Sequence, residues 1–329
     1  MRYSLRGKAD ELEARAADTK PLLGPFIMDG QATMIYAAPN TGKTLIVLHL
    51  LLAAIEQGLV DPNRVFYFNA DDGSQGLAVK ARLLQDVGAH MLAPGHRTFR
   101  IAHLVETMLQ AVDEDSARGT VIVIDTLKKA TDLMDKKRTS EFAQVCRQYV
   151  MAGGTIIALG HTRKNPKADG TAQYQGTTDI LEDFDAVYIA QLLKAKSDSS
   201  VRVVDFSMEK KRADSPDNVF YAYAADAGLS YEEKLVSVRA VDPDELDDYI
   251  AVEKFSHPEV MSAISTLIEA GECEGQMALM RKAAKASAVS ERVALRVLQE
   301  FTGTTPGLHL WNFRTGPRGV RHYDLIPQD

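Results

Sequence analysis

The stretch Ala37-Ala38-Pro39-Asn40-Thr41-Gly42-Lys43-Thr44 indicates the fold of this 329-residue chain. Residues 32–36 before it are typical of a short buried strand, and the apolar residues 45–54 after it are long enough for a buried helix. A strand, a loop and a helix N-terminus in this order direct backbone N–H groups and the helix dipole at a phosphate group. The stretch matches G-x-x-x-x-G-K-[ST] except at its first position, where Ala37 is acceptable if its φ is negative. We therefore expect the phosphate-binding loop of a nucleoside triphosphatase.

The loop and one later strand supply the residues expected to bind ATP and Mg²⁺. Lys43 should reach the β- and γ-phosphates, and the Thr44 hydroxyl group should bind Mg²⁺. Asp125 ends an apolar run, where a carboxylate is costly unless it holds a metal ion or one of its waters. It is the candidate Walker B acid, and a helix-capping role is the alternative. The expected nucleotide-binding residues are Pro39, Asn40, Thr41, Gly42, Lys43, Thr44 and Asp125, of which Thr44 and Asp125 hold the metal.

Composition limits the class of protein. The hydrophobic content of 45% and charged content of 25% are those of a globular protein, and no apolar run is long enough to span a membrane. Cys146 and Cys273 lack metal-ligand spacing, so we expect buried, reduced thiols in a cytoplasmic protein. The net charge of −7 argues against a generally basic DNA-coating protein, so any nucleic-acid contact requires local basic segments.

The order of apolar segments predicts an α/β fold with a central, mostly parallel sheet and helices on both faces. Strands are expected at 65–69, 99–102, 120–125 and 155–160, and helices at 76–87, 104–117 and 141–152. Three later strands, at 186–191, 201–208 and 219–224, are expected to extend the sheet as antiparallel edge strands. The predicted organisation is an N-terminal helix within 1–20, an ATPase domain at 21–227, an acidic linker at 228–256 and a small domain at 257–329. In that last domain the sequence predicts three helices followed by a basic hairpin, which is the order of elements in a winged helix.

Polar residues follow several of the predicted strands, where active groups of parallel sheets lie. Asp71 and Asp72 follow strand 65–69, and one carboxylate there is a candidate for activating the attacking water. An Asp-Gly turn without chemistry is the alternative. His161 is placed to touch a γ-phosphate, although an interior histidine with no such role fits the pattern equally well. The cluster Lys210-Lys211-Arg212 suits either a solvated face or a finger that reaches a neighbouring subunit's nucleotide.

Two long segments are basic in an otherwise acidic protein, and each follows a central strand. Such segments are typical of loops that hold nucleic-acid phosphates, and ordinary solvated loops are the alternative. Their candidate DNA-binding residues are Lys128, Lys129, Lys136, Lys137 and Arg138 in the first, and Arg163, Lys164 and Lys167 in the second.

Taken together, these motifs resemble the RecA-like hexameric ATPases, closest to plasmid RepA-type replicative helicases and more distantly to DnaB-type helicases. The resemblance covers about residues 20–226. It rests on A-P-N-T-G-K-T at 38–44, D-D-G at 71–73, I-D-T at 124–126, G-H-T-R-K at 160–164, G-T-T-D-I-L-E-D-F-D-A-V at 176–187 and K-K-R at 210–212.

The resemblance implies a RecA-like core with active sites between the subunits of a homo-oligomeric, hexameric ring. It implies that Asp71 takes the place of the catalytic Glu, His161 senses phosphate, and Lys210 and Arg212 act in trans. The basic loops would then line the pore and bind single-stranded DNA, and the N-terminal helix would dock on an adjacent subunit. Asp71 is one methylene shorter than the family's Glu.

We expect an ATP-dependent DNA helicase or translocase of plasmid or phage replication. The winged helix is expected to bind duplex DNA or a replication protein. Two other readings remain: a recombination ATPase that forms filaments on single-stranded DNA, and an assembly regulator or adaptor controlled by ATP.

Overall fold

The computed structural model describes residues 6–10, 13–14, 19–127, 136–162, 183–194, 200–211, 215–249, 258–271, 275–305, 309–316 and 319–327. The chain divides into two units, Met1–Ala251 and Val252–Asp329, each with its own core. The predicted N-terminal helix lies largely outside the described residues.

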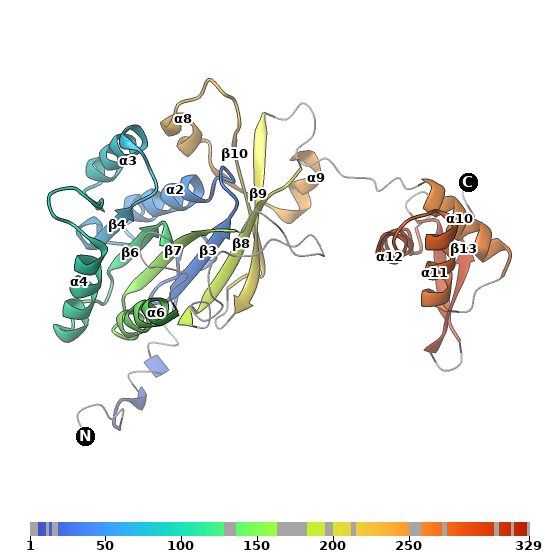
Figure 1. Ribbon diagram of the computed structural model, residues 1–329, viewed down its shortest axis with the longest axis horizontal. Coiled ribbons are helices and arrows are strands. Elements are labelled where there is room, and N and C mark those ends of the chain that lie inside the picture. The colour runs from blue at the N-terminus through green and yellow to red at the C-terminus, as the bar shows by residue number, and fades with distance from the viewer. Residues whose placement is uncertain are drawn as a thin grey trace. The chain divides into compact units, whose positions relative to one another are not determined.

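A nine-stranded sheet is the centre of the first unit, in the order β11-β10-β9-β8-β3-β7-β6-β4-β5 (Figure 1). The pairs from β8 to β5 are parallel, and those from β8 to β11 are antiparallel. A separate pair, β1 (Pro21–Leu23) and β2 (Ile27–Met28), precedes the sheet. The nine strands are β3 (Ala32–Ala37), β4 (Val65–Asn69), β5 (His90–Leu92), β6 (Val121–Asp125), β7 (Thr155–His161), β8 (Ala186–Leu192), β9 (Val201–Lys211), β10 (Asn218–Ala224) and β11 (Arg239–Val241).

Helices cover both faces of this sheet, so the predicted α/β fold with a mostly parallel sheet is confirmed (Figure 1). One face packs against α2 (Lys43–Glu56), α3 (Ser74–Asp86) and α8 (Tyr231–Val236). The other packs against α4 (Ile101–Asp113) and α6 (Lys136–Met151). Strands β3 and β6 are buried along their whole length because helices lie on both sides, which explains their unbroken apolar runs. Cys146 is a buried free thiol on α6.

The predicted strand at 99–102 is wrong. Ile101 begins α4, because Ile101, Leu104, Val105 and Met108 recur at helical spacing, and this stripe packs on the sheet. The edge strand beside β4 is instead β5, a three-residue segment too short to show a period in the sequence.

Strand β8 is parallel to β3, not antiparallel as expected, whereas β9 and β10 are antiparallel as expected. Residues 186–190 are buried because β8 lies inside the sheet, between β3 and β9. That position suits a parallel strand with helices or other elements on both faces.

Most of the predicted acidic linker at 228–256 belongs to the first unit. Ser230 and Glu233 form a capping box that starts α8, and β11 adds to the sheet beside β10. The 3₁₀ turn η2 (Pro243–Glu245) and the short α9 (Leu246–Tyr249) follow. Several acidic residues of this segment cap helices or lie in their first turns. They give the segment the acidic composition from which the sequence analysis predicted a linker.

The second unit holds three helices and a hairpin in the predicted order. They are α10 (Pro258–Glu269), α11 (Gln276–Ala286), α12 (Glu291–Glu300) and the antiparallel pair β12 (Trp311–Thr315) and β13 (Arg321–Leu325). Its core gathers around fully buried Trp311, whose indole N–H donates to the Leu298 carbonyl oxygen at 2.9 Å. The assignment of this unit as a winged helix stays a prediction.

Candidate nucleotide-binding site

The loop between β3 and α2 has the local geometry of a phosphate cradle. Ala37 is the last residue of β3, is fully buried, and is not among the described residues with positive φ, so a methyl group is accommodated there. Asn40 and Gly42 adopt left-handed conformations, with φ of 63° and 99°. The Thr41 hydroxyl group donates to the Ala38 carbonyl oxygen at 2.7 Å and closes the turn.

The N-terminus of α2 is open to an anion. Gly42 is the N-cap residue and supplies no side chain to the first N–H groups of the helix. Lys43 begins the helix and is only 6% exposed. Burial lowers the pKa of Lys43, while the charges of Asp125, Asp71 and then Asp72 oppose this effect. A cation held in so poorly solvated a position favours an anionic ligand.

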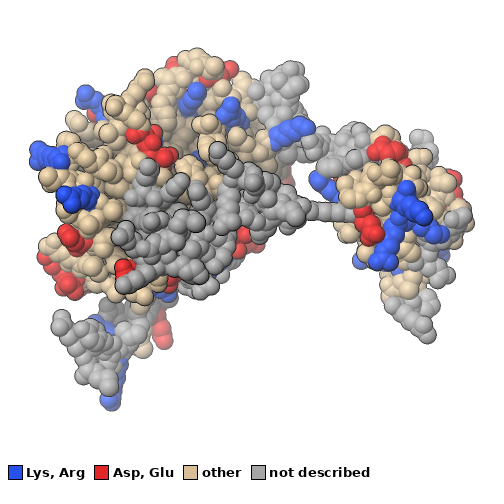
Figure 2. Space-filling view, in the orientation of Figure 1, with Lys and Arg blue, Asp and Glu red and all other residues tan. Residues whose placement is uncertain are grey.

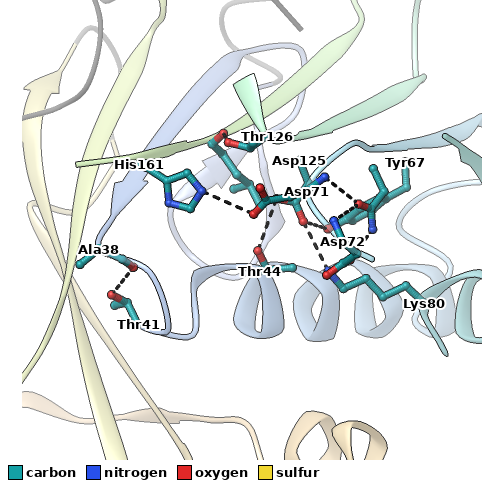
Figure 3. A network of polar contacts seen from close by, with 12 residues as sticks. Ala38, Thr41, Thr44, Tyr67, Asp71, Asp72, Lys80, Asp125, Thr126 and His161 are labelled. Atoms are coloured by element: carbon teal, nitrogen blue, oxygen red, sulfur yellow. Dashed lines mark hydrogen bonds and ion pairs between the residues drawn. The ribbon is translucent and has the colours of Figure 1, made fainter. Parts of the chain in front are cut away.

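Asp125 lies at the end of β6 and is 1% exposed (Figure 3). Its Oδ2 atom accepts a hydrogen bond of 2.8 Å from the Tyr67 hydroxyl group and lies 3.6 Å from the Lys80 ammonium nitrogen. Its Oδ1 atom accepts from the Thr44 hydroxyl group at 3.5 Å. Thr126 is turned away, because its hydroxyl group donates to the Leu159 carbonyl oxygen at 2.8 Å. The carboxylate is therefore presented to the first turn of α2.

The turn after β4 separates the two aspartates that follow this strand. Asn69 accepts from the N–H groups of Asp71 and Asp72, each at 3.2 Å, and donates to Asp72 Oδ2 at 2.6 Å. Asp72 Oδ2 also lies 2.5 Å from the ammonium nitrogen of Lys80. The Asp72 carboxylate is therefore fixed by its contacts with Asn69 and Lys80, whereas the Asp71 side chain is 41% exposed to solvent.

His161 ends β7, beside Ala37 at the end of β3. Its Nε2 atom lies 3.4 Å from Asp71 Oδ2, and its Nδ1 atom is buried with no hydrogen-bond partner in the described structure. His161, Asp71, Asp125 and Thr44 come from four different elements and meet at the carboxyl ends of β7, β4 and β6 (Figure 3).

The residues present fit Mg²⁺ and a triphosphate. Hydroxyl and carboxylate oxygens are the ligands that Mg²⁺ prefers, and Thr44 and Asp125 place one of each side by side. No group of three His, Cys, Asp or Glu side chains that could enclose a metal is present in the described part of the chain. Such a cage is not required, because nucleotide-bound Mg²⁺ keeps waters and phosphate oxygens as ligands. Pro39 and Asn40 are exposed and available to the same ligand.

The other predicted site residues are not brought to this cluster by the described structure. Lys210 is half-buried in β9, beside Val187 of β8. The predictions for Arg212, Lys128, Lys129, Arg163, Lys164 and Lys167 lie outside the described residues, and Lys136, Lys137 and Arg138 begin α6 with side chains that are not described.

Sequence reasoning missed several residues of this site: Tyr67, Asn69, Lys80 and Tyr223. One signal for Lys80 was available, because it lies three residues after Leu77 and four before Leu84, on the apolar stripe of α3. Tyr67 gives no such signal, since tyrosine is common in buried strands. Tyr223 of β10 packs against the loop, and its hydroxyl group donates to the Thr41 carbonyl oxygen at 3.3 Å.

Comparison with known families agrees with this geometry. The profile described as "AAA domain" matches residues 3–167, which is 165 of 329 residues. No curated protein matches the chain. Among the described helices, none combines the length and apolar character that a membrane span needs. The chain therefore belongs to the AAA domain family and is a P-loop ATPase.

Proposed function

We propose that this ATPase is a ring-forming DNA helicase or translocase of plasmid or phage replication, in which ATP hydrolysis between subunits moves single-stranded DNA. The proposal of ATP hydrolysis is supported above all by the pair formed by Asp71 and His161. An exposed carboxylate and an imidazole, 3.4 Å apart, face the open end of the phosphate loop.

In the proposed reaction, the residues position and neutralise charge. Lys43 and the N–H groups of α2 would bind the phosphates, and Thr44 and Asp125 would hold Mg²⁺, which would neutralise charge on the phosphates. Asp71 orients the attacking water and accepts its proton. His161 detects whether the terminal phosphate is present. Lys210 and Arg212 are proposed to contact the nucleotide of the adjacent subunit.

Two features support DNA as the partner. The basic segments in the sequence directly follow β6 and β7, the strands that end in Asp125 and His161. Lys128 is three residues after Asp125, and Arg163 is two residues after His161, so a change at either strand end on hydrolysis is close in sequence to a proposed DNA-binding residue. The motif series also resembles replicative helicases, as set out above.

The C-terminal unit is proposed to be a winged helix that binds duplex DNA or a replication protein. Basic side chains gather on its visible face, with acidic side chains beside them (Figure 2). Exposed Arg281, Lys282 and Lys285 lie on α11. On the hairpin, Arg314 is paired with Asp324 and is therefore less available to phosphates.

The test is ATP hydrolysis with and without single-stranded DNA, in the wild type and in Asp71→Ala. We expect strong stimulation by DNA and a loss of about 10²- to 10⁴-fold in kcat in the variant. Fluorescent ADP should bind both proteins with similar affinity, because the loop and Lys43 are intact. Asp86→Ala is the matched control, since Asp86 is an exposed aspartate at the end of α3. Unstimulated turnover would contradict the motor.

The two other readings are separable. Negative-stain microscopy with nucleotide and DNA distinguishes closed rings from the filaments of a recombination ATPase. The adaptor reading is favoured by the short side chain of Asp71, which leaves the water further from its base than a Glu would. Negligible turnover, with assembly that responds to ATP, would select that reading.

A further inference from the structure

Lys80 is a buried cation that has no role in the hydrolytic mechanism proposed above. It lies in the middle of α3, and its side chain is 6% exposed. Its ammonium nitrogen is 2.5 Å from Asp72 Oδ2 and 3.6 Å from Asp125 Oδ2 (Figure 3). One positive charge is thus shared by two carboxylates, Asp72 in the turn after β4 and Asp125 at the end of β6.

On the β6 side, Lys80 helps to orient Asp125. The Oδ2 atom contacts both Lys80 and the Tyr67 hydroxyl group, and Oδ1 is left facing Thr44. A carboxylate that is 1% exposed requires compensation for its lost hydration, which these contacts supply.

On the β4 side, Lys80 holds the turn that carries Asp71. It binds Asp72, Asp72 accepts from the Asn69 amide group, and Asn69 in turn accepts from the backbone N–H groups of residues 71 and 72. The chain of contacts ends at the backbone of Asp71. Among the described residues, the Asp71 carboxylate has one polar side-chain contact, which is with His161.

We propose that Lys80 is a positioning residue that ties the Asp71 turn to the metal-binding Asp125, so that the base and the metal site keep one relative position. The proposal rests on the proposed ATP hydrolysis by Asp71. Without the Lys80 charge, Asp72 and Asp125 repel each other through a poorly solvated space, and the turn moves away from β6. Misplacement of a catalytic group by about 1 Å costs as much as 10²-fold in rate.

The first experiment measures kcat and KM for ATP in Lys80→Met, which removes the charge and keeps an unbranched side chain. We expect kcat to fall about 10- to 100-fold, with KM changed little, because Lys43 and the phosphate loop are untouched. Lys80→Arg should recover most of kcat, since a guanidinium group can contact two carboxylates. The matched control is Arg82→Met, which loses an exposed positive charge from the same helix and should behave as the wild type.

Asp72→Asn tests the same link without touching Lys80, which matters if Lys80→Met does not fold. It should lower kcat as Lys80→Met does, and the double variant should lose no more than either single variant. Multiplied losses in the double variant, or a wild-type kcat in Lys80→Met, would overturn the proposal.

A second readout does not depend on hydrolysis. Binding of fluorescent ADP is titrated with Mg²⁺ in each variant. Lys80 orients Asp125 and also offsets its charge, so Lys80→Met should change the Mg²⁺ concentration for half-maximal binding several-fold. Lys80→Arg and Arg82→Met should match the wild type. An unchanged Mg²⁺ requirement in Lys80→Met would overturn the link to Asp125. If the wild type binds ADP but does not hydrolyse ATP, the proposed function fails while this titration still decides the role of Lys80.

Discussion

Gly42→Ala is expected to damage the phosphate loop by two separate physical effects. Gly42 has a φ of 99°, which L-residues rarely adopt, and it is the N-cap residue of α2. A methyl group there would lie 2.6 Å from the nearest ring carbon of Tyr223. The ring cannot move aside freely, because Tyr223 is 6% exposed and its hydroxyl group is bonded to the Thr41 carbonyl oxygen.

The two effects have comparable size. The left-handed conformation costs an Ala roughly 1–2 kcal/mol relative to Gly. Overpacking against a buried ring costs roughly 1–3 kcal/mol more. We therefore expect Gly42→Ala to destabilise the first unit by about 2–5 kcal/mol. In a Tyr223→Ala background only the backbone cost remains, so the same change should cost about 1–2 kcal/mol.

The assay uses the single tryptophan of the chain as an internal control. Trp311 lies in the second unit, so its fluorescence follows unfolding of that unit, whereas circular dichroism follows both. In urea, Gly42→Ala should shift the circular dichroism transition of the first unit and leave the Trp311 transition unchanged. Fluorescent ADP should bind more weakly as well. An equal cost in the wild-type and Tyr223→Ala backgrounds would refute the predicted clash.

Three further predictions concern pH, the hairpin and the proposed ring. Burial lowers the pKa of His49, whose Nδ1 atom lies 2.9 Å from the Leu235 carbonyl oxygen. As the pH drops below 6.5, the unfolded chain therefore binds a proton at His49 before the folded chain does, and the stability of the folded protein should fall. Thermal melting from pH about 7.5 to about 5.5 should show a weaker pH dependence in His49→Gln than in the wild type, and equal slopes would contradict this prediction. Asp324→Asn frees Arg314 from its ion pair. If the hairpin binds duplex DNA, the affinity for DNA should rise, and the slope of log affinity against log salt concentration should steepen by about one. Anisotropy titrations measure both quantities, and an unchanged slope would argue against DNA binding by the hairpin. If Arg212 acts in trans, mixing Arg212→Ala with Lys43→Ala subunits should partly restore ATP hydrolysis, and no restoration at any ratio counts against it.

Much of the first unit was predictable because its signals are local. Strand β4 matches the predicted bounds, and β3, β6 and β7 match within a residue or two, since each is an apolar run bounded by polar or turn residues. The phosphate loop was readable for the same reason. Errors arose where the local signal was weak or shared, as at Ile101, whose apolar neighbours fit a strand over four residues and a helix over eight.

The candidate site was predictable only in part. Lys43, Thr44, Asp71, Asp125 and His161 could be proposed from the sequence because each ends or follows an apolar strand or lies in the loop motif. The structure brings them together at the carboxyl ends of the central strands, and their roles stay predictions. Which of Asp71 and Asp72 is available was not predictable. That choice depends on the contacts of Asp72 with Lys80 and Asn69, which the sequence pattern does not express.

The sequence by itself determined the class of fold and the identity of the phosphate loop, because both follow from the period of apolar residues and from a short motif with its own backbone geometry. Only the tertiary structure decided the order of the strands, the parallel direction of β8 and the place of β11. It also decided that Lys80 joins Asp72 to Asp125 and that Tyr223 packs on Gly42, a contact between residues 181 positions apart in the chain. These features depend on which combination of buried contacts and charge pairs gives the whole folded unit its lowest free energy. No local stretch of sequence contains that information.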